Sequence, residues 1–448
     1  MTTDPHQLQD LLQQARQRGA SAGDVLLVDN HAFEVEVRLG AVEKIQHSHQ
    51  KRVGLRLFFG QRSATTSTSD LSAASLKSLL DDTCALAQAM AEDPYGGLPE
   101  PQDIIITVPE LGLWDEALEH LPINERTAMA EAAERAALEY DARITNSEGG
   151  AYSSSQSRVV YANSYGFVGH YSAGSVSLSV APIASDGHGM QRDYWYATTR
   201  QLDRLPTPAT IGREAAQRAL RRLGARKVAT QRIPVVFDPI TASSVLGHLC
   251  SAVSGSAIYR GASFLVDQLG ERIAPAGVTV YDDGTLPAAL GSKPFDGEGL
   301  PTRRTPVVEA GVLRNYLLDT YAARKLGMRA TGNAARSAGE PPSVSPTNFY
   351  LEAGPSTPEE IIASVPRGLY VTELIGFGVN QITGDYSRGA VGLWIDQGEL
   401  THAVEEVTIA GNLRQMFANI AMIGNDLDLR RKVAAPTVKI AEMTVAGI

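Results

Sequence analysis

The chain has little cysteine, no long apolar run and no excess of basic charge. Its 448 residues include only Cys84 and Cys250, which are too few for a disulfide framework and suit a reducing compartment. No stretch approaches the roughly 20 apolar residues needed to cross a bilayer, and the polar stretch 1–17 has no apolar signal-peptide core. These absences predict a soluble, cytoplasmic protein with no membrane contact.

The charge balance bears on possible partners. A net charge of −10 argues against a general nucleic-acid binder, because neutralising phosphates requires a basic surface. The densest basic run, 218–227, is predicted to be the exposed face of a helix. We therefore expect no direct contact with nucleic acid.

The length of 448 residues predicts two domains. The separate runs of helices and strands predict an α+β fold. Residues 1–225 are expected to form a mixed helix and antiparallel-sheet domain, and residues 226–448 a mainly β domain with a helix at its start. Expected helices cover 6–18, 70–91 with Asp70 as N-cap, 123–140, 211–223, 357–363 and 412–422. Expected strands cover 25–30, 33–39, 52–60 and several runs within 144–200, with a hairpin turn at 396–398 in the second half.

The most informative stretch is DPITASSVLGHLCSAVSGSAIYRGASF, residues 238–264. Asp238 is a good helix N-cap and Pro239 suits the first helical position, so a helix is expected to begin here. The residues at helical spacing that predict its buried side are Ile240, Leu246, Leu249 and Val253. The residues that helical geometry places on a second side, made mostly of small side chains, are Ser244, His248, Ser251, Ala252 and Gly255.

This second side has the setting of a metallopeptidase site without its chemistry. A zinc hydrolase needs two or three His, Cys or carboxylate ligands and a Glu as general base. Between Pro239 and Arg260 there is one histidine and no Asp or Glu. His248 is therefore predicted to be a hydrogen-bonding residue, and we expect no catalytic residue and no metal or other cofactor in this chain.

Several segments resemble the TldD/PmbA family of peptidase-related proteins, and within it the PmbA (TldE) branch. They are GHLCSAVSGSAIYRGASFLVD (247–267), GLYVTELIG (368–376), TGDYSRGAVGLWIDQGELTHAVEEVTIAGNL (383–413), IGNDLD (423–428) and MTVAG (443–447). The TldD branch carries His-Glu-x-x-x-His on this helix, and a cysteine after the GNDL segment as a further zinc ligand. Here His248 takes the first histidine position, Leu249 the glutamate position and Val253 that of the second histidine, and no cysteine follows GNDL.

The resemblance implies a TldE/PmbA-like subunit of a cytoplasmic metalloprotease. Such a subunit pairs with a TldD-like subunit that holds the zinc and the Glu base, and the complex acts on flexible peptides, including an antitoxin and a microcin precursor. This chain would carry a pseudo-active site and supply part of the wall of an enclosed cavity. The candidate cavity-facing residues are Ser244, Ser251, Gly255 and Arg260.

Two alternatives remain open. The chain could be a homodimeric hydrolase with a non-standard site that combines His248 with groups from residues 320–348. It could instead be a regulatory protein-binding factor, as the family's older label of gyrase modulator suggests, acting through protein contacts. The sequence is compatible with pairing to a TldD-like subunit or to a second copy of itself.

Histidines outside this helix have ordinary interpretations. His47 and His49 occupy positions i and i+2 of a possible strand, so both could point the same way and share a metal. Their polar surroundings, HSHQKR, favour a solvated face. His170 and His188 have no ligand spacing to other residues and are predicted to lie at the surface or form hydrogen bonds.

Three further motifs also favour structural roles. Asp282 and Asp283 precede a glycine after a strand, which is typical of a turn. The segment GFGVNQITG (376–384) lacks the strand-then-helix context of a phosphate loop. The serines at 251, 254 and 256 do not lie in the G-x-S-x-G motif of a nucleophilic serine.

Overall fold

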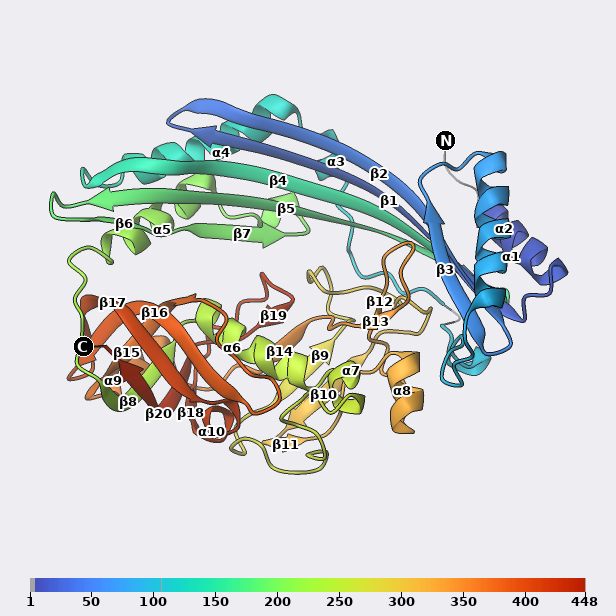
Figure 1. Cartoon of the computed structure of the whole chain (residues 1–448). Coiled ribbons are helices and arrows are strands. Elements are labelled where there is room, and N and C mark those ends of the chain that lie inside the picture. The colour runs from blue at the N-terminus through green and yellow to red at the C-terminus, as the bar shows by residue number, and fades with distance from the viewer. Residues whose placement is uncertain (1–4, 106, 448) are drawn as a thin grey trace.

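A long antiparallel sheet from the first half of the chain arches over the second half (Figure 1). The computed structural model describes residues 5–105 and 107–447. The strand order of this sheet, the arch, is β3-β2-β1-β4-β5-β6, with β7 also paired to β5. Its strands are β1 (Ala22–Arg38), β2 (Ala41–Phe59), β3 (Arg62–Thr68), β4 (Ile144–Asn163), β5 (Val168–Ser185), β6 (Met190–Arg192) and β7 (Trp195–Thr199).

Strand β1 runs without interruption through residues that were expected to separate two strands. Its residues 24–37 pair with β4, and the whole strand pairs with β2, so that His31 lies opposite both His49 and Gln156. Pairing on both sides satisfies the backbone hydrogen-bonding groups of this central segment, so it stays extended although its side chains are polar. The expected break near 31–32 and the late start of the next strand at 52 are therefore wrong.

The two faces of the arch differ. On the outer face, Val25 and Leu27 pack with α1 (Pro5–Gln17) and α2 (Ala73–Ala89), while Val35 and Val37 pack with α4 (Ile123–Leu138) and α5 (Pro208–Leu220). The alternate residue Leu26 points to the inner face, where it packs with Phe295 from the second half of the chain. The inner face is therefore turned toward the second half.

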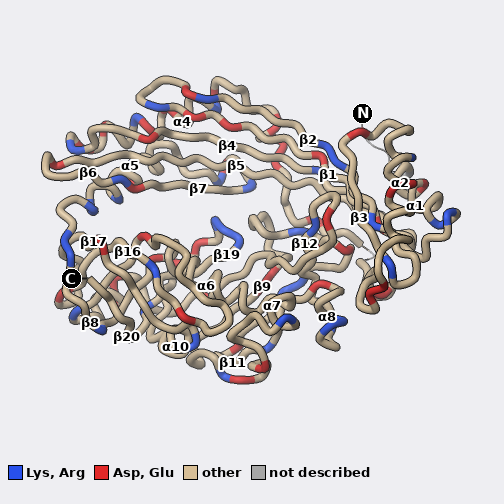
Figure 2. Tube along the Cα trace, in the orientation of Figure 1, with Lys and Arg blue, Asp and Glu red and all other residues tan. Residues whose placement is uncertain are grey.

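The charges of the arch lie mainly on β1 and β2, whereas β5 contains no Lys, Arg, Asp or Glu (Figure 2). Short elements connect the longer ones: α3 (Ala117–His120) and the 3-10 helices η1 (Pro101–Asp103) and η2 (Leu202–Arg204). The prediction that Asp70 is the N-cap of α2 is wrong. Ser72 caps this helix, because its hydroxyl accepts a hydrogen bond from Ser75 N, and Asp70 in turn accepts one from Ser72 N.

Two sheets and the helix between them form the second half. One sheet has the order β17-β16-β15-β8-β20-β18, with β17 also pairing β20, and the other has the order β11-β10-β9-β14-β19. The strands of the first are β8 (Gln231–Phe237), β15 (Arg367–Ile375), β16 (Asp385–Asp396), β17 (Glu399–Asn412), β18 (Ile420–Ile423) and β20 (Val438–Ala446). Those of the second are β9 (Val280–Asp283), β10 (Arg304–Glu309), β11 (Val312–Leu313), β14 (Phe349–Leu351) and β19 (Val433–Ala434), and β12 (Ala334–Ala335) pairs with β13 (Ser343–Val344).

Helix α6 (Pro239–Ala252) contacts strands of both sheets, and α7 (Gly255–Tyr259), α8 (Thr320–Leu326), α9 (Pro358–Ala363) and α10 (Leu413–Ala418) lie around them. The predicted α+β class is confirmed. The hairpin turn lies where it was expected, because β16 ends at Asp396 and Gln397 and Gly398 have positive φ. The helix expected to reach residue 422 ends at Ala418, since the chain then enters β18 beside β20. No helix in the described part of the chain is long and apolar enough to span a bilayer.

A buried ionic network joins the arch to the second half. Asp24 of β1, Arg56 of β2 and Glu298 are 0%, 6% and 2% exposed. Arg56 lies 3.1 Å from Asp24 (Nε to Oδ2) and 3.5 Å from Glu298 (Nη1 to Oε1), and Arg336 also donates to Asp24. Burial opposes the ionisation of Asp24, but Arg336 and Arg56 outweigh it and lower the pKa of this carboxyl.

The basic run 218–227 does not form an exposed helix face, which corrects the sequence prediction. Arg218 is 5% exposed, and its guanidinium lies 3.4 Å from Asp193 and 3.7 Å from Asp238. Because Asp238 is the N-cap of α6, the contact between Arg218 and Asp238 links α5, which packs on the arch, to the second half of the chain. The two acids lie far from Arg218 in sequence and could not be identified as its partners from spacing.

Replacing Arg336 by Ala should lower the free energy of unfolding by about 3–5 kcal/mol, because Asp24 then keeps a buried charge with one cation fewer. The matched control is Arg232→Ala, which removes the exposed pair with Glu442 and should cost less than about 1 kcal/mol. Chemical denaturation followed by tryptophan fluorescence measures both. Equal effects of the two substitutions would refute this account of the network.

Candidate functional site

Helix α6 begins as the sequence predicts. Asp238 is its N-cap and accepts a hydrogen bond from Thr241 N at 2.8 Å, and Pro239 occupies the first helical position. The helix ends at Ala252, before Val253 and Gly255, which were expected to lie on its two sides. The backbone N–H of Leu317 donates a hydrogen bond to Val253 O, and the carbonyl of Leu317 accepts one from Gly255 N. This pairing with a distant segment separates α6 from α7, which begins at Gly255.

The expected division of α6 into two sides is largely observed. Its buried side includes Leu246, Leu249 and Val253, which are 4%, 2% and 0% exposed. The other side is a strip in which Ser244, Gly247 and His248 are half-buried and Ser251 is exposed. We call these four residues the α6 strip.

The remaining candidate residues lie away from the strip. Ala252 is fully buried, and Gly255 is packed so closely that an added Cβ would lie 2.4 Å from Leu318 Cδ2. Gly255 therefore serves close packing between α7 and Leu318. Arg260 is exposed just after α7, with its guanidinium 5.4 Å from the centre of the Tyr259 ring.

His248 contacts the segment that joins β15 to β16 and the start of β16. Its Nδ1 lies 3.3 Å from Gln381 Nε2, and its ring meets the edge of Tyr386 with the centroids 5.8 Å apart. His248 Nε2 and Gln381 Oε1 are buried without a hydrogen-bond partner among the described residues. Since buried polar groups are normally paired, these two atoms are available to a ligand or a partner.

Arg388 of β16 sets the electrostatics of the strip. Its Nη1 donates to Ser244 Oγ at 2.8 Å and its Nη2 to Leu374 O at 3.3 Å. Burial lowers the pKa of His248, and the positive charge of Arg388 lowers it further. The imidazole is thus kept neutral beside a fixed cation.

The surroundings of His248 do not fit a zinc ion. Among residues 5–105 and 107–447, no set of three convergent His, Cys, Asp or Glu side chains includes His248. Leu249 points the other way and lines an apolar cavity of about 30 Å³ together with Leu246 and Phe237. A site with one imidazole beside a guanidinium has too few ligands and the wrong charge for zinc.

The other serines and the cysteine of this region have structural roles. Ser251 donates to Gly247 O at 3.0 Å, as a helical serine often does, and the hydroxyls of Ser254 and Ser256 lie 2.9 Å apart. Cys250 is buried, and burial raises the pKa of its thiol. None of these groups hydrogen-bonds to His248, so this histidine activates none of them as a nucleophile.

The two aspartates expected in a turn end strand β9 instead, with the turn beginning at Gly284. Asp282 accepts from Asn333 and Thr347, whereas Asp283 accepts from Thr285, so the carboxylates have separate partners.

The segment 376–384 leads from strand β15 into strand β16, without the helix that a phosphate loop requires. His170 and His188 are exposed, as predicted.

His47 and His49 share the outer face of the arch, as their spacing suggested, and both are exposed. Sequence reasoning missed that His49 lies opposite His31 and close to Asp29. A register counted from the Leu39-Gly40 turn would place His31 opposite Ser48, and the irregularity between Glu36 and Val37 shifts the pairing by one residue, so the sequence carried no signal for this pair.

The segment beside the α6 strip exposes large apolar side chains. Ile375, Phe377 and Ile382 are 53%, 97% and 59% exposed, and Gln381 of the same segment contacts His248. We call Ile375, Phe377 and Ile382 the apolar loop.

Introducing the missing glutamate should not restore a metal site. Leu249→Glu places a carboxylate in the apolar core and should destabilise the protein by about 3 kcal/mol or more. Leu249→Met, of similar volume, should cost less than about 1.5 kcal/mol. Denaturation of both variants tests this; a stable Leu249→Glu protein with newly bound zinc would contradict the described orientation of Leu249.

Family models match most of the chain. They describe PmbA/TldA metallopeptidase domain 1 at residues 23–87, the central domain at 116–223 and the C-terminal domain at 230–447. The metalloprotease PmbA of Escherichia coli O157:H7 is 36% identical over 96% of this chain and 93% of its own length. The PmbA homologue of Haemophilus influenzae is 33% identical over 97% of this chain and 94% of its own.

Solved structures share the fold. A putative modulator of DNA gyrase from Bacteroides thetaiotaomicron superposes with a TM-score of 0.92 at 29% identity and full coverage of both chains. TldE from Thermococcus kodakarensis has a TM-score of 0.89 at 20% identity, over 99% of this chain and 100% of its own, and so supports the fold alone. On the strength of the three family models and the PmbA relatives, this chain belongs to the PmbA/TldD metallopeptidase family.

Proposed function

We propose that this chain is the TldE/PmbA-like subunit of a cytoplasmic TldD/TldE-type metalloprotease that acts on flexible peptides. The TldD-like partner would hold the zinc and the general base. This chain would contribute a pseudo-active site and part of the cavity wall. The observation that carries the proposal is the α6 strip of this member of a metallopeptidase family. The strip has one neutral imidazole beside Arg388, and within the described part of the chain no convergent set of metal ligands includes that imidazole.

The apolar loop supports a protein partner at this position. Phe377 is 97% exposed, and Ile375 and Ile382 are more than half exposed. Three large apolar side chains exposed within one short segment favour a protein interface there. The unpaired atoms His248 Nε2 and Gln381 Oε1 lie next to the loop and would be satisfied by the same partner.

The inner face of the arch supports an extended, unfolded substrate. A pocket of about 280 Å³ there is lined mostly by hydroxyl and amide side chains, including Gln46, Ser48 and Ser153, and also by the charged Glu34. Uncharged polar groups can hydrogen-bond any peptide backbone without demanding a particular charge. This composition is consistent with a wall that accepts flexible segments of varied sequence.

Peptidase activity should require both kinds of subunit. The chain alone, supplied with zinc, should not hydrolyse an unfolded peptide, and adding a TldD-type subunit should produce turnover. His248→Ala in the pair should leave kcat within about threefold of the wild-type pair, since this residue would neither bind zinc nor transfer a proton. Rates of cleavage of a fluorogenic unfolded peptide, with gel filtration to verify assembly, measure these effects.

The results distinguish the alternatives. Turnover by the chain alone, abolished by His248→Ala while folding and assembly persist, would establish the homodimeric hydrolase instead. Recovery of gyrase without a TldD-like protein in a pull-down would favour the regulatory protein-binding factor.

Pairing should depend on the apolar loop. Phe377→Ser should weaken association with the TldD-type subunit, or with a second copy of this chain, by about tenfold or more, because a buried aromatic anchor contributes more than its area suggests. The matched control is Met190→Ser, which replaces another exposed apolar residue, 74% exposed, on β6. Sedimentation equilibrium measures the dissociation constants; equal constants for both variants would exclude the loop from the interface.

A further inference from the structure

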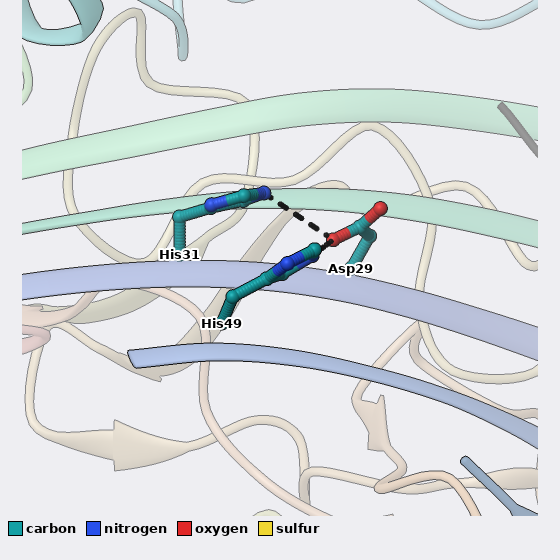
Figure 3. Close-up of side chains that lie close together, drawn as sticks. All are labelled: Asp29, His31 and His49. Atoms are coloured by element: carbon teal, nitrogen blue, oxygen red, sulfur yellow. Dashed lines mark hydrogen bonds and ion pairs between the residues drawn. The ribbon is translucent and has the colours of Figure 1, made fainter. Parts of the chain in front are cut away.

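Two histidines and an aspartate come together in the middle of the outer face of the arch. The hairpin register places His31 of β1 opposite His49 of β2, and Asp29 precedes His31 by two residues on the same face. One ligand atom from each of the three side chains lies within 4.8 Å of the other two. Figure 3 shows both imidazoles directed at the carboxylate of Asp29.

The donor atoms converge on one carboxylate oxygen. Asp29 Oδ1 lies 2.7 Å from His49 Nε2 and 3.5 Å from His31 Nε2. The two rings stack with their centroids 3.9 Å apart and an interplanar angle of 16°. Ligands bonded to one tetrahedral ion at about 2.1 Å are about 3.4 Å apart, which is comparable with the spacing of these donors. Because stacked rings hold their in-plane lone pairs almost parallel, the imidazoles must rotate for both to face one ion.

We propose that Asp29, His31 and His49 form a binding site for a divalent transition-metal ion. Two imidazoles and one carboxylate favour zinc, nickel or copper(II) over magnesium or calcium, which prefer oxygen ligands throughout. The metal would replace the direct hydrogen bond between His49 and Asp29 and bond to all three side chains.

Lys51 pairs with the other oxygen of the Asp29 carboxylate. Lys51 Nζ lies 3.4 Å from Asp29 Oδ2, the oxygen that does not face the imidazoles. A carboxylate binds a metal in its ionised form, which is the ordinary form of an aspartate at neutral pH.

The site opens to a pocket. The helices of the outer face pack near the two ends of β1, and between them lies a pocket of about 420 Å³. Its lining includes Asp29, His31, His47, Trp114, Glu119 and Arg126. A metal bound by three side chains here would keep at least one coordination position open to water or a small ligand. The pocket lies on the opposite face of the sheet from the inner, serine-rich face, so the site is independent of the proposed function.

Metal binding should be lost when either histidine is removed. Isothermal titration of Zn²⁺ into the untagged, chelator-treated chain should show one equivalent bound, and His31→Ala and His49→Ala should each weaken binding by at least about tenfold. These side chains are 47% and 51% exposed, so both variants should fold. Asp29→Asn, which keeps the shape of the side chain, should also weaken binding.

The matched control is His47→Ala. His47 lies on the same face of β2 and lines the same pocket, but it is not one of the three convergent ligands. Zn²⁺ should therefore raise the thermal unfolding midpoint of the wild type and of His47→Ala, but not that of His31→Ala. Absence of binding by the wild type, unchanged binding by His31→Ala, or equal loss in His47→Ala would each overturn the proposal.

The same titration separates this site from the proposed function. Binding should be unaffected by His248→Ala and should occur without peptide hydrolysis by the chain alone. Loss of binding in His248→Ala would move the metal to the α6 strip and overturn the assignment to the arch. Peptide hydrolysis by the chain alone that persists in His31→Ala would contradict the proposed function, but it would not contradict the metal site on the arch.

Discussion

The position of the arch depends on charges that are buried between it and the second half of the chain. Asp24 has two guanidinium partners, Arg56 from its own sheet and Arg336 from the second half, and Glu298 lies against Arg56 from the other side. Glu298 also accepts from Thr320 N at 2.9 Å, which fixes the start of α8. Ions removed from water are tolerated only when they are paired and hydrogen-bonded. The two halves must therefore meet in this geometry, and any sliding between them would leave a charge uncompensated.

A second ionic contact near the other end of the arch has a more direct relation to the candidate site. Arg218 of α5 lies near Asp238, whose side chain begins α6. The helix that carries His248 is thus oriented both by the sheets that contact it and by the arch. Arg218 lies against the N-cap of α6, and backbone hydrogen bonds to Leu317 follow the last residue of the helix, so the α6 strip is short. It presents His248 to the segment that contains Gln381, and this arrangement joins the strip to the apolar loop.

Local signals were readable from sequence, and contacts between distant segments were not. Asp238-Pro239 and Gln397-Gly398 determine their own backbone geometry, so a helix start and a hairpin turn could be predicted. The end of α6 depends on Leu317, and the burial of Arg218 depends on Asp193 and Asp238. The α+β class followed from the pattern of elements, whereas the continuity of β1 required knowing that β4 pairs with it.

The two histidine environments show why the number of convergent donors matters more than the setting of any one histidine. His248 lies on a helix whose sequence suggested the setting of a metallopeptidase site, yet its neighbours are an amide, a phenol ring and the guanidinium of Arg388. His31 and His49 lie in a polar strand pair that looked like an ordinary solvated face, yet the hairpin register brings them to one carboxylate. A metal ion binds where lone pairs converge on a point about 2 Å from each donor. Sheet register can create such convergence from residues with no motif, and a single helix side with one imidazole cannot.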